Sequence, residues 1–283
     1  MNGAARLRSV LIAPADQPAL AAKLPRSDPD GVMLDLEDAV APHAKETARI
    51  QAGDSVAMLR RDHAKIAVFV RVNAVLTDWF DADVEAMAGL DLAGLVVPKL
   101  ETVAQLAQIR EALTRAGMAD LPIVAGIESA LGVEHVAELL VAPVTIAYFG
   151  AEDYVADLGG VRTEDNLEVL YARSRVALAT RTHHVYALDQ IVAAFDQPAR
   201  FERDAAQGRA LGFRGKLCIH PAQVGVANRV FSPSPHELDR ARRLVDAYDA
   251  ALAAGVGVIA FEGQMVDEPL AKQARALLGA AED

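Results

Sequence analysis

The chain is poor in cysteine and tryptophan, with one of each among its 283 residues. A single cysteine, Cys218, cannot form an internal disulfide, which excludes the disulfide-stapled class of small secreted domain. It is expected to be a small buried hydrophobe on a strand rather than a nucleophile. No apolar run reaches the length that a bilayer span needs, and no apolar signal core follows the N-terminal arginines, so we expect a cytoplasmic protein without a membrane partner.

Basic residues are also few, with 28 Lys and Arg against 39 Asp and Glu, giving a net charge of -11. This balance argues against a nucleic-acid partner. An anionic substrate is repelled by the chain as a whole and must therefore meet a local group of Lys and Arg side chains. The sequence has no visible internal repeat and no low-complexity linker, which favours one large domain with an appendage.

Short apolar runs alternate with helical patterns along most of the chain. The runs at 122–127 and 144–149 are separated by apolar residues at helical spacing over 132–140, which predicts a strand-helix-strand unit with parallel strands. Eight such units predict a TIM (β/α)8 barrel. The expected strands are residues 8–13, 31–35, 66–72, 94–97, 122–127, 144–149, 185–188 and 215–219.

The barrel is expected to occupy residues 1–230, and residues 231–283 form an element set that a closed barrel does not need. This C-terminal extension is predicted to contain a helix over 235–253, a strand over 257–261 and a last helix from Pro269. Its apolar residues, including Val258 and Phe261, must be buried somewhere, and a neighbouring subunit is a plausible place.

Polar residues at the strand ends are the candidate site, because TIM barrels carry their active sites at the carboxyl ends of the strands. Glu128 and Asp153 follow adjacent strands, and two carboxylates there suit Mg²⁺, which completes its coordination with water and substrate oxygens. The alternative is that both acids cap helices. Arg71 follows the third strand and is predicted to clamp a substrate carboxylate; the alternative is an ion pair with Glu37 or Asp38.

Two further strand-end residues allow other chemistry. Lys99 would form a Schiff base in a metal-independent aldolase, but acids on neighbouring strand ends favour a charged ion-pair partner. His220 is either an acid/base group or a structural histidine bonded to backbone at the barrel rim.

Taken together, these motifs resemble the HpcH/HpaI aldolase and citrate lyase β-subunit family of CoA-ester lyases, over nearly the full length of the chain. The residues that carry the resemblance are Arg8-Ser-Val-Leu with Pro14, LDLEDAV at 34–40, VRVN at 70–73, VPK at 97–99, IES at 127–129, FGAED at 149–153, GFRGKLCIHPAQV at 212–224 and GQMVDEP at 263–269.

The resemblance implies a Mg²⁺-dependent TIM barrel, commonly a homotrimer or a hexamer. It further implies a lyase that cleaves or forms a 3-hydroxyacyl-CoA thioester such as malyl-, citramalyl- or citryl-CoA, giving an acyl-CoA and an α-keto acid. Glu128 and Asp153 are then the metal ligands, and Arg71 holds the substrate carboxylate. By the same resemblance Glu37 and Asp38 lie around the metal without binding it, and Asp267 is a catalytic group delivered from a neighbouring subunit.

The first βα loop departs from the family pattern. Relatives often carry basic residues there that meet the CoA phosphates, whereas this chain has Asp16-Gln17-Pro18-Ala19 and keeps Lys23, with Arg26 behind it, for that role. Two alternatives therefore stay open: a metal-dependent aldolase acting on a hydroxy-keto acid without CoA, and an accessory subunit that needs an acyl-carrier partner. The acyl group and its stereochemistry depend on pocket shape, which the sequence does not specify.

Overall fold

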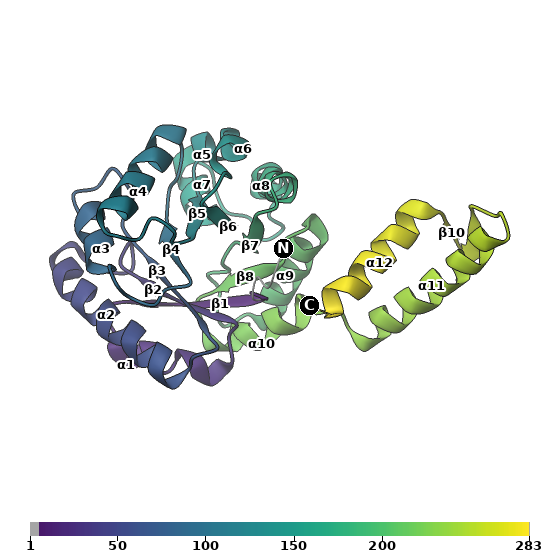
Figure 1. Ribbon diagram of the computed structural model, residues 1–283, viewed down its shortest axis with the longest axis horizontal. Coiled ribbons are helices and arrows are strands. Elements are labelled where there is room, and N and C mark those ends of the chain that lie inside the picture. Colours follow the sequence, from purple (N-terminus) through teal and green to yellow (C-terminus); the bar gives the residue numbers. More distant parts are fainter. Residues whose placement is uncertain (1–5, 283) are drawn as a thin grey trace. The chain divides into compact units, whose positions relative to one another are not determined.

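The computed structural model describes residues 6–282 and divides into two compact units, Leu7–Phe231 and the segment from Ser232 onward. The outer ends of the two expected domains, residues 1–5 and 283, lie outside the described residues. In the first unit eight parallel strands form a closed barrel in sequence order, in which β1 pairs with both β2 and β8 (Figure 1). The predicted TIM barrel is confirmed.

The strand bounds lie within two residues of the expected ones. Apolar, largely β-branched runs form these strands because both faces of a parallel barrel strand are buried, one in the interior and one under the helices. The strands are β1 (Ser9–Pro14), β2 (Gly31–Asp35), β3 (Ala67–Arg71), β4 (Gly94–Val97), β5 (Ile123–Ile127), β6 (Val144–Phe149), β7 (Tyr186–Asp189) and β8 (Gly215–Cys218).

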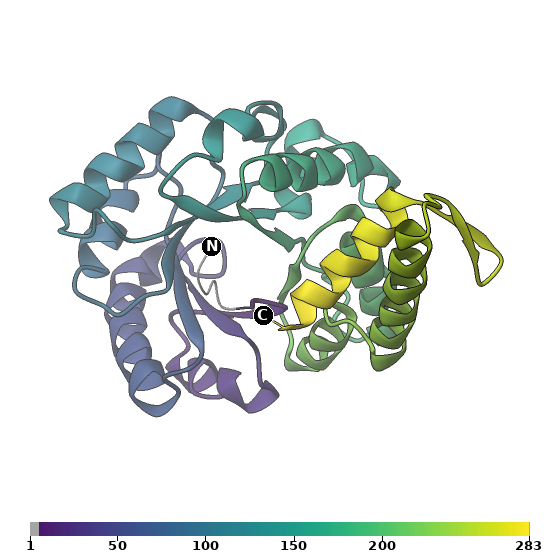
Figure 2. The same ribbon diagram turned by 45° about the vertical axis from the view of Figure 1, so that its right-hand side comes forward.

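The helices of this unit form a ring around the barrel (Figures 1 and 2). The longer α-helices are α2 (Lys45–Asp62), α3 (Phe80–Ala86), α4 (Val103–Arg115), α7 (Ala151–Leu158), α8 (Leu170–Thr182), α9 (Pro198–Leu211) and α10 (Pro221–Val230). The short ones are α1 (Pro18–Ala21), α5 (Ala130–Glu134), α6 (Val136–Leu139) and the 3-10 turns η1 (Leu24–Ser27), η2 (Pro42–Ala44) and η3 (Leu167–Val169).

Two segments differ from the sequence-based expectation. The helix expected over 132–140 is interrupted at His135, whose Nδ1 donates a hydrogen bond to the Glu101 carbonyl at 2.9 Å. Residues 154–158, expected to begin a loop, belong to α7, which starts after Gly150 and ends at Gly159 in the left-handed conformation. Asp153 therefore lies in the first turn of a helix.

The second unit pairs two helices with a β-hairpin. It comprises α11 (Pro235–Ala253), β9 (Ile259–Phe261), β10 (Gln264–Val266) and α12 (Glu268–Glu282). Glu262 and Gly263 both have positive φ, as a tight hairpin turn requires. The second strand was not expected from the sequence. The unit has a small core of its own, formed by Ala241, Leu244, Tyr248, Val266, Ala271 and Ala274.

None of the helices between residues 6 and 282 combines the length and the apolar character that crossing a bilayer requires.

Candidate active site

The carboxyl ends of the barrel strands surround a cavity of about 280 Å³. Three predicted site residues from different parts of the chain line it: Arg71 at the end of β3, Glu128 just after β5 and Asp153 in α7. The lining also includes apolar residues, among them Ile12, Leu217 and Ile219. The fold thus brings a guanidinium and two carboxylates into one small space.

Asp35 at the end of β2 fixes the Arg71 side chain. Arg71 Nε and Nη2 each donate to a different oxygen of Asp35 at 2.7 Å, and Nη1 lies 3.3 Å from Glu37 Oε2. Burial acts to raise the pKa of Asp35, yet it lies below its usual value because the guanidinium stabilises the carboxylate. This bidentate pair still leaves N–H groups on Nη1 and Nη2 for a second carboxylate.

Lys99 is an ion-pair partner in this arrangement. Its Nζ lies 2.7 Å from Glu37, 3.0 Å from Asp38 and 3.5 Å from Asp153. Partial burial opposes the charge, but these acids raise the pKa of Lys99, so the amine stays protonated. A protonated amine is not a nucleophile, which favours the ion-pair interpretation over the Schiff base. The Lys99 backbone is left-handed, with φ of 51°, a strained conformation of the kind found at functional sites.

The carboxylates of the site carry more negative charge than the two cations neutralise. Glu128 is only 2% exposed, and its pKa is raised by burial and further by Asp153, against the lowering effect of Arg71. Burial likewise raises the pKa of Glu37 to about 7, against Arg71 and Lys99, and Glu37 Oε2 accepts no hydrogen bond within the described chain.

This donor set fits a hard divalent cation. Mg²⁺ prefers carboxylate oxygens and needs only one or two from the protein. Between residues 6 and 282 no three His, Cys, Asp or Glu side chains converge as a complete protein cage would need, so the candidate ligands are the pair Glu128 and Asp153.

Lys45 holds the segment that carries Glu37 and Asp38 through hydrogen bonds. This buried lysine donates from Nζ to the carbonyls of Leu36 and Glu37, at 2.6 and 2.7 Å, and to Asn73 Oδ1 at 2.7 Å. All three acceptors are neutral, and these hydrogen bonds position the loop that carries the two acids.

Gly150, which follows β6, makes room for the predicted metal ligand Glu128, which follows the neighbouring strand β5. A Cβ atom at Gly150 would lie 2.5 Å from Cγ of Glu128 and 2.8 Å from Oε1. The glycine of the FGAED motif thus has a steric reason, because any side chain there would displace Glu128.

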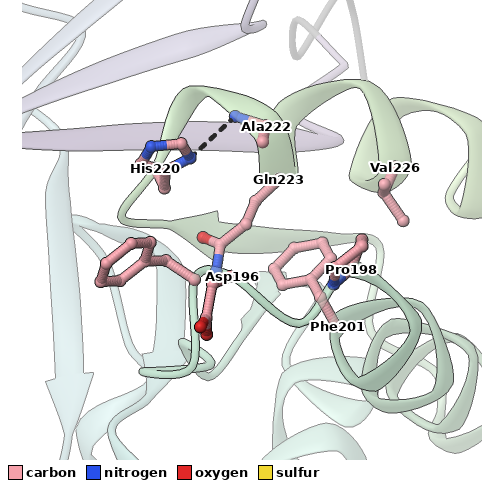
Figure 3. A pocket seen from close by; sticks show the side chains of 8 residues that line it. Asp196, Pro198, Phe201, His220, Ala222, Gln223 and Val226 are labelled. Atoms are coloured by element: carbon pink, nitrogen blue, oxygen red, sulfur yellow. Dashed lines mark hydrogen bonds between the residues drawn. The ribbon is translucent and has the colours of Figure 1, made fainter.

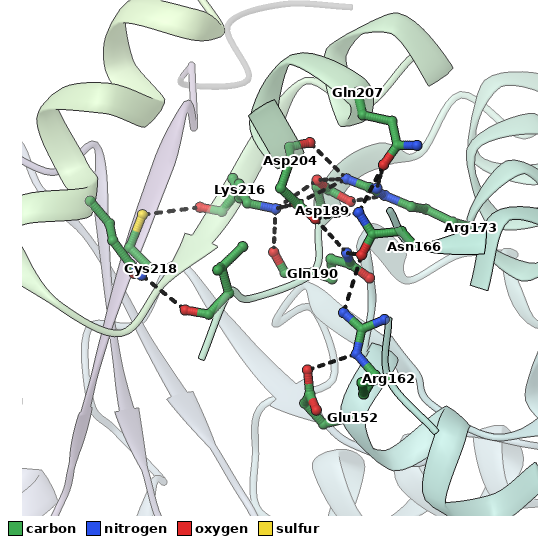
Figure 4. A network of polar contacts seen from close by, with 12 residues as sticks. Glu152, Arg162, Asn166, Arg173, Asp189, Gln190, Asp204, Gln207, Lys216 and Cys218 are labelled. Atoms are coloured by element: carbon green, nitrogen blue, oxygen red, sulfur yellow. Dashed lines mark hydrogen bonds and ion pairs between the residues drawn. The ribbon is translucent and has the colours of Figure 1, made fainter. Parts of the chain in front are cut away.

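Two strand-end residues serve the framework instead. His220 accepts a hydrogen bond at Nδ1 from the Ala222 amide and caps α10, at the edge of a separate apolar pocket with Phe195 and Phe201 (Figure 3). Asp189 is fully buried between Arg173 and Lys216 (Figure 4).

Cys218 is the buried hydrophobe that the sequence predicts. It lies on β8 with no exposed surface, and burial raises the pKa of its thiol to about 12.

Four predicted site residues are not part of the cavity lining. Glu37 and Asp38 are ion-pair partners of Lys99. Lys23 is exposed just before η1. Asp267 is half-buried in the second unit, immediately before α12. Their roles in binding CoA phosphates and in catalysis stay predictions.

Tyr148 on β6 also lines the cavity, although the sequence did not predict it as a site residue. Its place in a strand was clear, and alternation along that strand puts every second residue inside the barrel. Nothing in the sequence, however, distinguishes a tyrosine that lines a cavity from one whose hydroxyl is paired in the core.

Comparison with known proteins gives one consistent result. The model of the family described as HpcH/HpaI aldolase/citrate lyase matches residues 8–221. A citrate lyase subunit beta-like protein of Deinococcus radiodurans is 51% identical over 97% of this chain and 97% of its own. A (3S)-malyl-CoA thioesterase of Cereibacter sphaeroides is 34% identical over 97% and 94%.

A solved structure extends the likeness to three dimensions. The protein CitE of Mycobacterium tuberculosis, in complex with magnesium, acetoacetate and coenzyme A, has a TM-score of 0.81 to this chain. The two are 33% identical, and the match covers 97% of this chain and 98% of that one.

Proposed function

The chain belongs to the HpcH/HpaI aldolase/citrate lyase family, and we propose that it is a Mg²⁺-dependent carbon-carbon lyase acting on a 3-hydroxyacyl-CoA thioester. The products are an acyl-CoA and an α-keto acid. The observation that carries the proposal is that Arg71, Glu128 and Asp153 line one cavity at the carboxyl ends of the strands. The CitE structure with magnesium and coenzyme A supports the choice of cofactor and thioester.

The residues divide the chemistry between them. Glu128 and Asp153 would hold the metal, and Arg71, which Asp35 orients, would hold the carboxylate of the substrate. When bound, Mg²⁺ lowers the pKa of a hydroxyl next to that carboxylate. Transfer of the hydroxyl proton to a base would let the adjacent carbon-carbon bond break, which would release the α-keto acid and leave a thioester enolate for a nearby acid to protonate.

We assign that protonation to Asp267, delivered from the second unit of a neighbouring subunit in a homotrimer or hexamer. The apolar side chains exposed on the unit, Val256, Val258 and Met265, support burial against another chain. Glu37 and Asp38 hold Lys99 beside the metal ligands, and Lys23 is assigned to the CoA phosphates.

Release of α-keto acid from a panel of hydroxyacyl-CoA thioesters tests the proposal. Cleavage of malyl-, citramalyl- and citryl-CoA releases glyoxylate, pyruvate and oxaloacetate respectively. We expect activity on at least one, reversible loss with EDTA, and loss of Mg²⁺ binding in Glu128→Gln and Asp153→Asn while the barrel stays folded by circular dichroism. Activity that survives EDTA but is destroyed by borohydride plus substrate would establish a Lys99 imine instead.

A further inference from the structure

Tyr148 has a buried hydroxyl that is left without a partner. The residue is 1% exposed, and its hydroxyl makes no hydrogen bond of normal geometry within the described chain. The Glu128 carboxylate is close enough for the hydroxyl to lower its pKa, but the two groups do not form a well-aligned bond. A buried polar group without a partner costs stability, so such a group is retained for a reason other than the fold.

A second tyrosine inside the same barrel shows what a structural hydroxyl looks like. Tyr186 on β7 accepts a hydrogen bond from the Leu7 amide at 3.0 Å and donates to the Arg214 carbonyl at 3.2 Å. Both tyrosines belong to the apolar interior of the barrel. Only Tyr148, of these two, also lines the cavity of the candidate active site.

Gly126 on the neighbouring strand β5 leaves the space that the Tyr148 side chain occupies. Gly126 pairs with Tyr148 in the sheet, and a Cβ atom there would lie 2.6 Å from the Tyr148 hydroxyl oxygen. The ring therefore lies across β5 at the boundary between the packed interior and the cavity. Tyr148 therefore forms part of the cavity floor.

The charged groups near the hydroxyl determine which kind of ligand it can bind. Burial, reinforced by Glu128, raises the pKa of Tyr148, so the group is a neutral donor at physiological pH. Arg71 is close enough to affect that pKa in the opposite direction. Arg71 and Tyr148 line the same cavity, so an anionic oxygen held there by Arg71 can accept from a hydroxyl that lacks a well-aligned partner.

We propose that Tyr148 is a substrate-binding residue, whose hydroxyl donates a hydrogen bond to the α-keto acid carboxylate held by Arg71. The inference rests on the proposed function and deepens it, because it assigns the floor of the cavity to the keto-acid half of the substrate. A phenol adds a directional donor beside the guanidinium of Arg71 without adding charge.

The test compares Tyr148→Phe with the matched variant Tyr186→Phe. Calorimetric titration with glyoxylate, pyruvate and oxaloacetate in saturating Mg²⁺ first identifies which of them the wild-type protein binds. For that acid, Tyr148→Phe should raise the Kd roughly tenfold or more, as loss of a hydrogen bond to a charged group does. Its affinity for Mg²⁺ alone should not change, and Tyr186→Phe should bind the acid as the wild type does.

Thermal unfolding without ligand gives a second measurement, in which the two variants are expected to differ in the direction of their Tm change. Tyr148→Phe should leave Tm unchanged or raise it, because an unpaired buried hydroxyl is removed. Tyr186→Phe should lower Tm, because it leaves the Leu7 amide and the Arg214 carbonyl without their partner.

Three outcomes would overturn the inference. An unchanged Kd for the keto acid in Tyr148→Phe would show that the hydroxyl does not bind the substrate, and it would leave the proposed function intact. Weaker Mg²⁺ binding or a lower Tm in that variant assigns the hydroxyl to Glu128 or to the fold. A wild-type protein that binds none of the three acids refutes the proposed function and the inference together.

Discussion

At the scale of single residues, the space left by Gly150 controls the position of Glu128. Gly150→Ala would place a methyl group in contact with the predicted metal ligand, and we expect the affinity for Mg²⁺ to fall roughly tenfold or more, as it does when groups that orient ligands are changed. Calorimetric titration with Mg²⁺ measures the effect. Gly225→Ala on α10 is the matched control, since a Cβ atom there meets no atom within 4 Å. Equal affinities for Mg²⁺ in the two variants would contradict the prediction that Glu128 is a metal ligand.

Arg71 gives the second prediction at this scale. Arg71→Lys keeps the charge but loses the planar fork, so keto-acid binding should weaken about tenfold while Mg²⁺ affinity stays within a factor of about two. Arg49→Lys is the control, because Arg49 forms a comparable pair with the buried Asp83 away from the cavity. We expect it to lower stability without changing keto-acid affinity. Binding by Arg71→Lys equal to that of the wild type would leave Arg71 as no more than the structural partner of Asp35.

Residues at strand ends were predictable from the sequence because a strand boundary fixes where its last side chain goes. Arg71 and Glu128 lie in the cavity for that reason, whereas Asp153 reaches it from the first turn of α7. Their partners were not predictable, since Asp35 rather than Glu37 or Asp38 takes both arms of the guanidinium. That choice depends on β2 and β3 pairing Asp35 directly with Arg71, a register that no local pattern encodes.

At the scale of elements, the strands were predicted more accurately than the helices around them. β2 and β4 have the expected bounds because each begins at a glycine and ends where the apolar run stops. α7 was partly missed because the glycines at its C-terminal end indicated a loop. Its start was signalled by acids in the first turn, which stabilise a helix N-terminus.

The elements β7, β8, α8 and α9 are joined by a buried ionic network, which gives a pH-dependent prediction. Asp204 on α9 contacts Lys216 and Arg173 (Figure 4). Although burial acts to raise it, these cations lower the pKa of Asp204 to about 2. Its carboxylate therefore stabilises the fold at pH values above its unfolded pKa, near 4, and this contribution of about 2 kcal/mol is lost as the pH falls from about 4 to about 2.

Asp204→Asn should lower the free energy of unfolding by roughly 3 kcal/mol at neutral pH, because it leaves buried cations short of an acid. The difference from the wild type should shrink by about 1 kcal/mol between pH 5 and pH 3. Urea unfolding at both pH values measures it. Asp54→Asn, exposed on α2, should change stability little at either pH. A difference independent of pH would mean that folding does not change the pKa of Asp204.

At the scale of the whole molecule, the proposed active site draws on both units of the chain. Glu128 belongs to the barrel unit and Asp267 to the C-terminal unit. If Asp267 serves a neighbouring subunit, Glu128→Ala and Asp267→Ala homo-oligomers are each nearly inactive, and mixing them by co-expression should restore part of the activity. Lyase assays on the mixtures, with light scattering to show the oligomeric state, measure this.

A mixture of Glu128→Ala with Asp153→Ala is the control for complementation. Both changes lie in the barrel unit, so no combination of subunits restores an intact barrel, and activity should stay absent. Hetero-oligomers of Glu128→Ala and Asp267→Ala that form but remain inactive would show that Asp267 serves its own barrel or only caps α12.

The pairing of β1 with β8 also has a consequence for how the protein is made. The first strand leaves the ribosome early, but the partner for its second edge, residues 215–218, is synthesised only after most of the chain. Until then β1 carries an unpaired row of backbone groups, which is a template for contact with other chains. Synthesis of the barrel thus includes a long interval in which an apolar edge must be shielded, and we expect the nascent chain to depend on chaperones until β8 closes it.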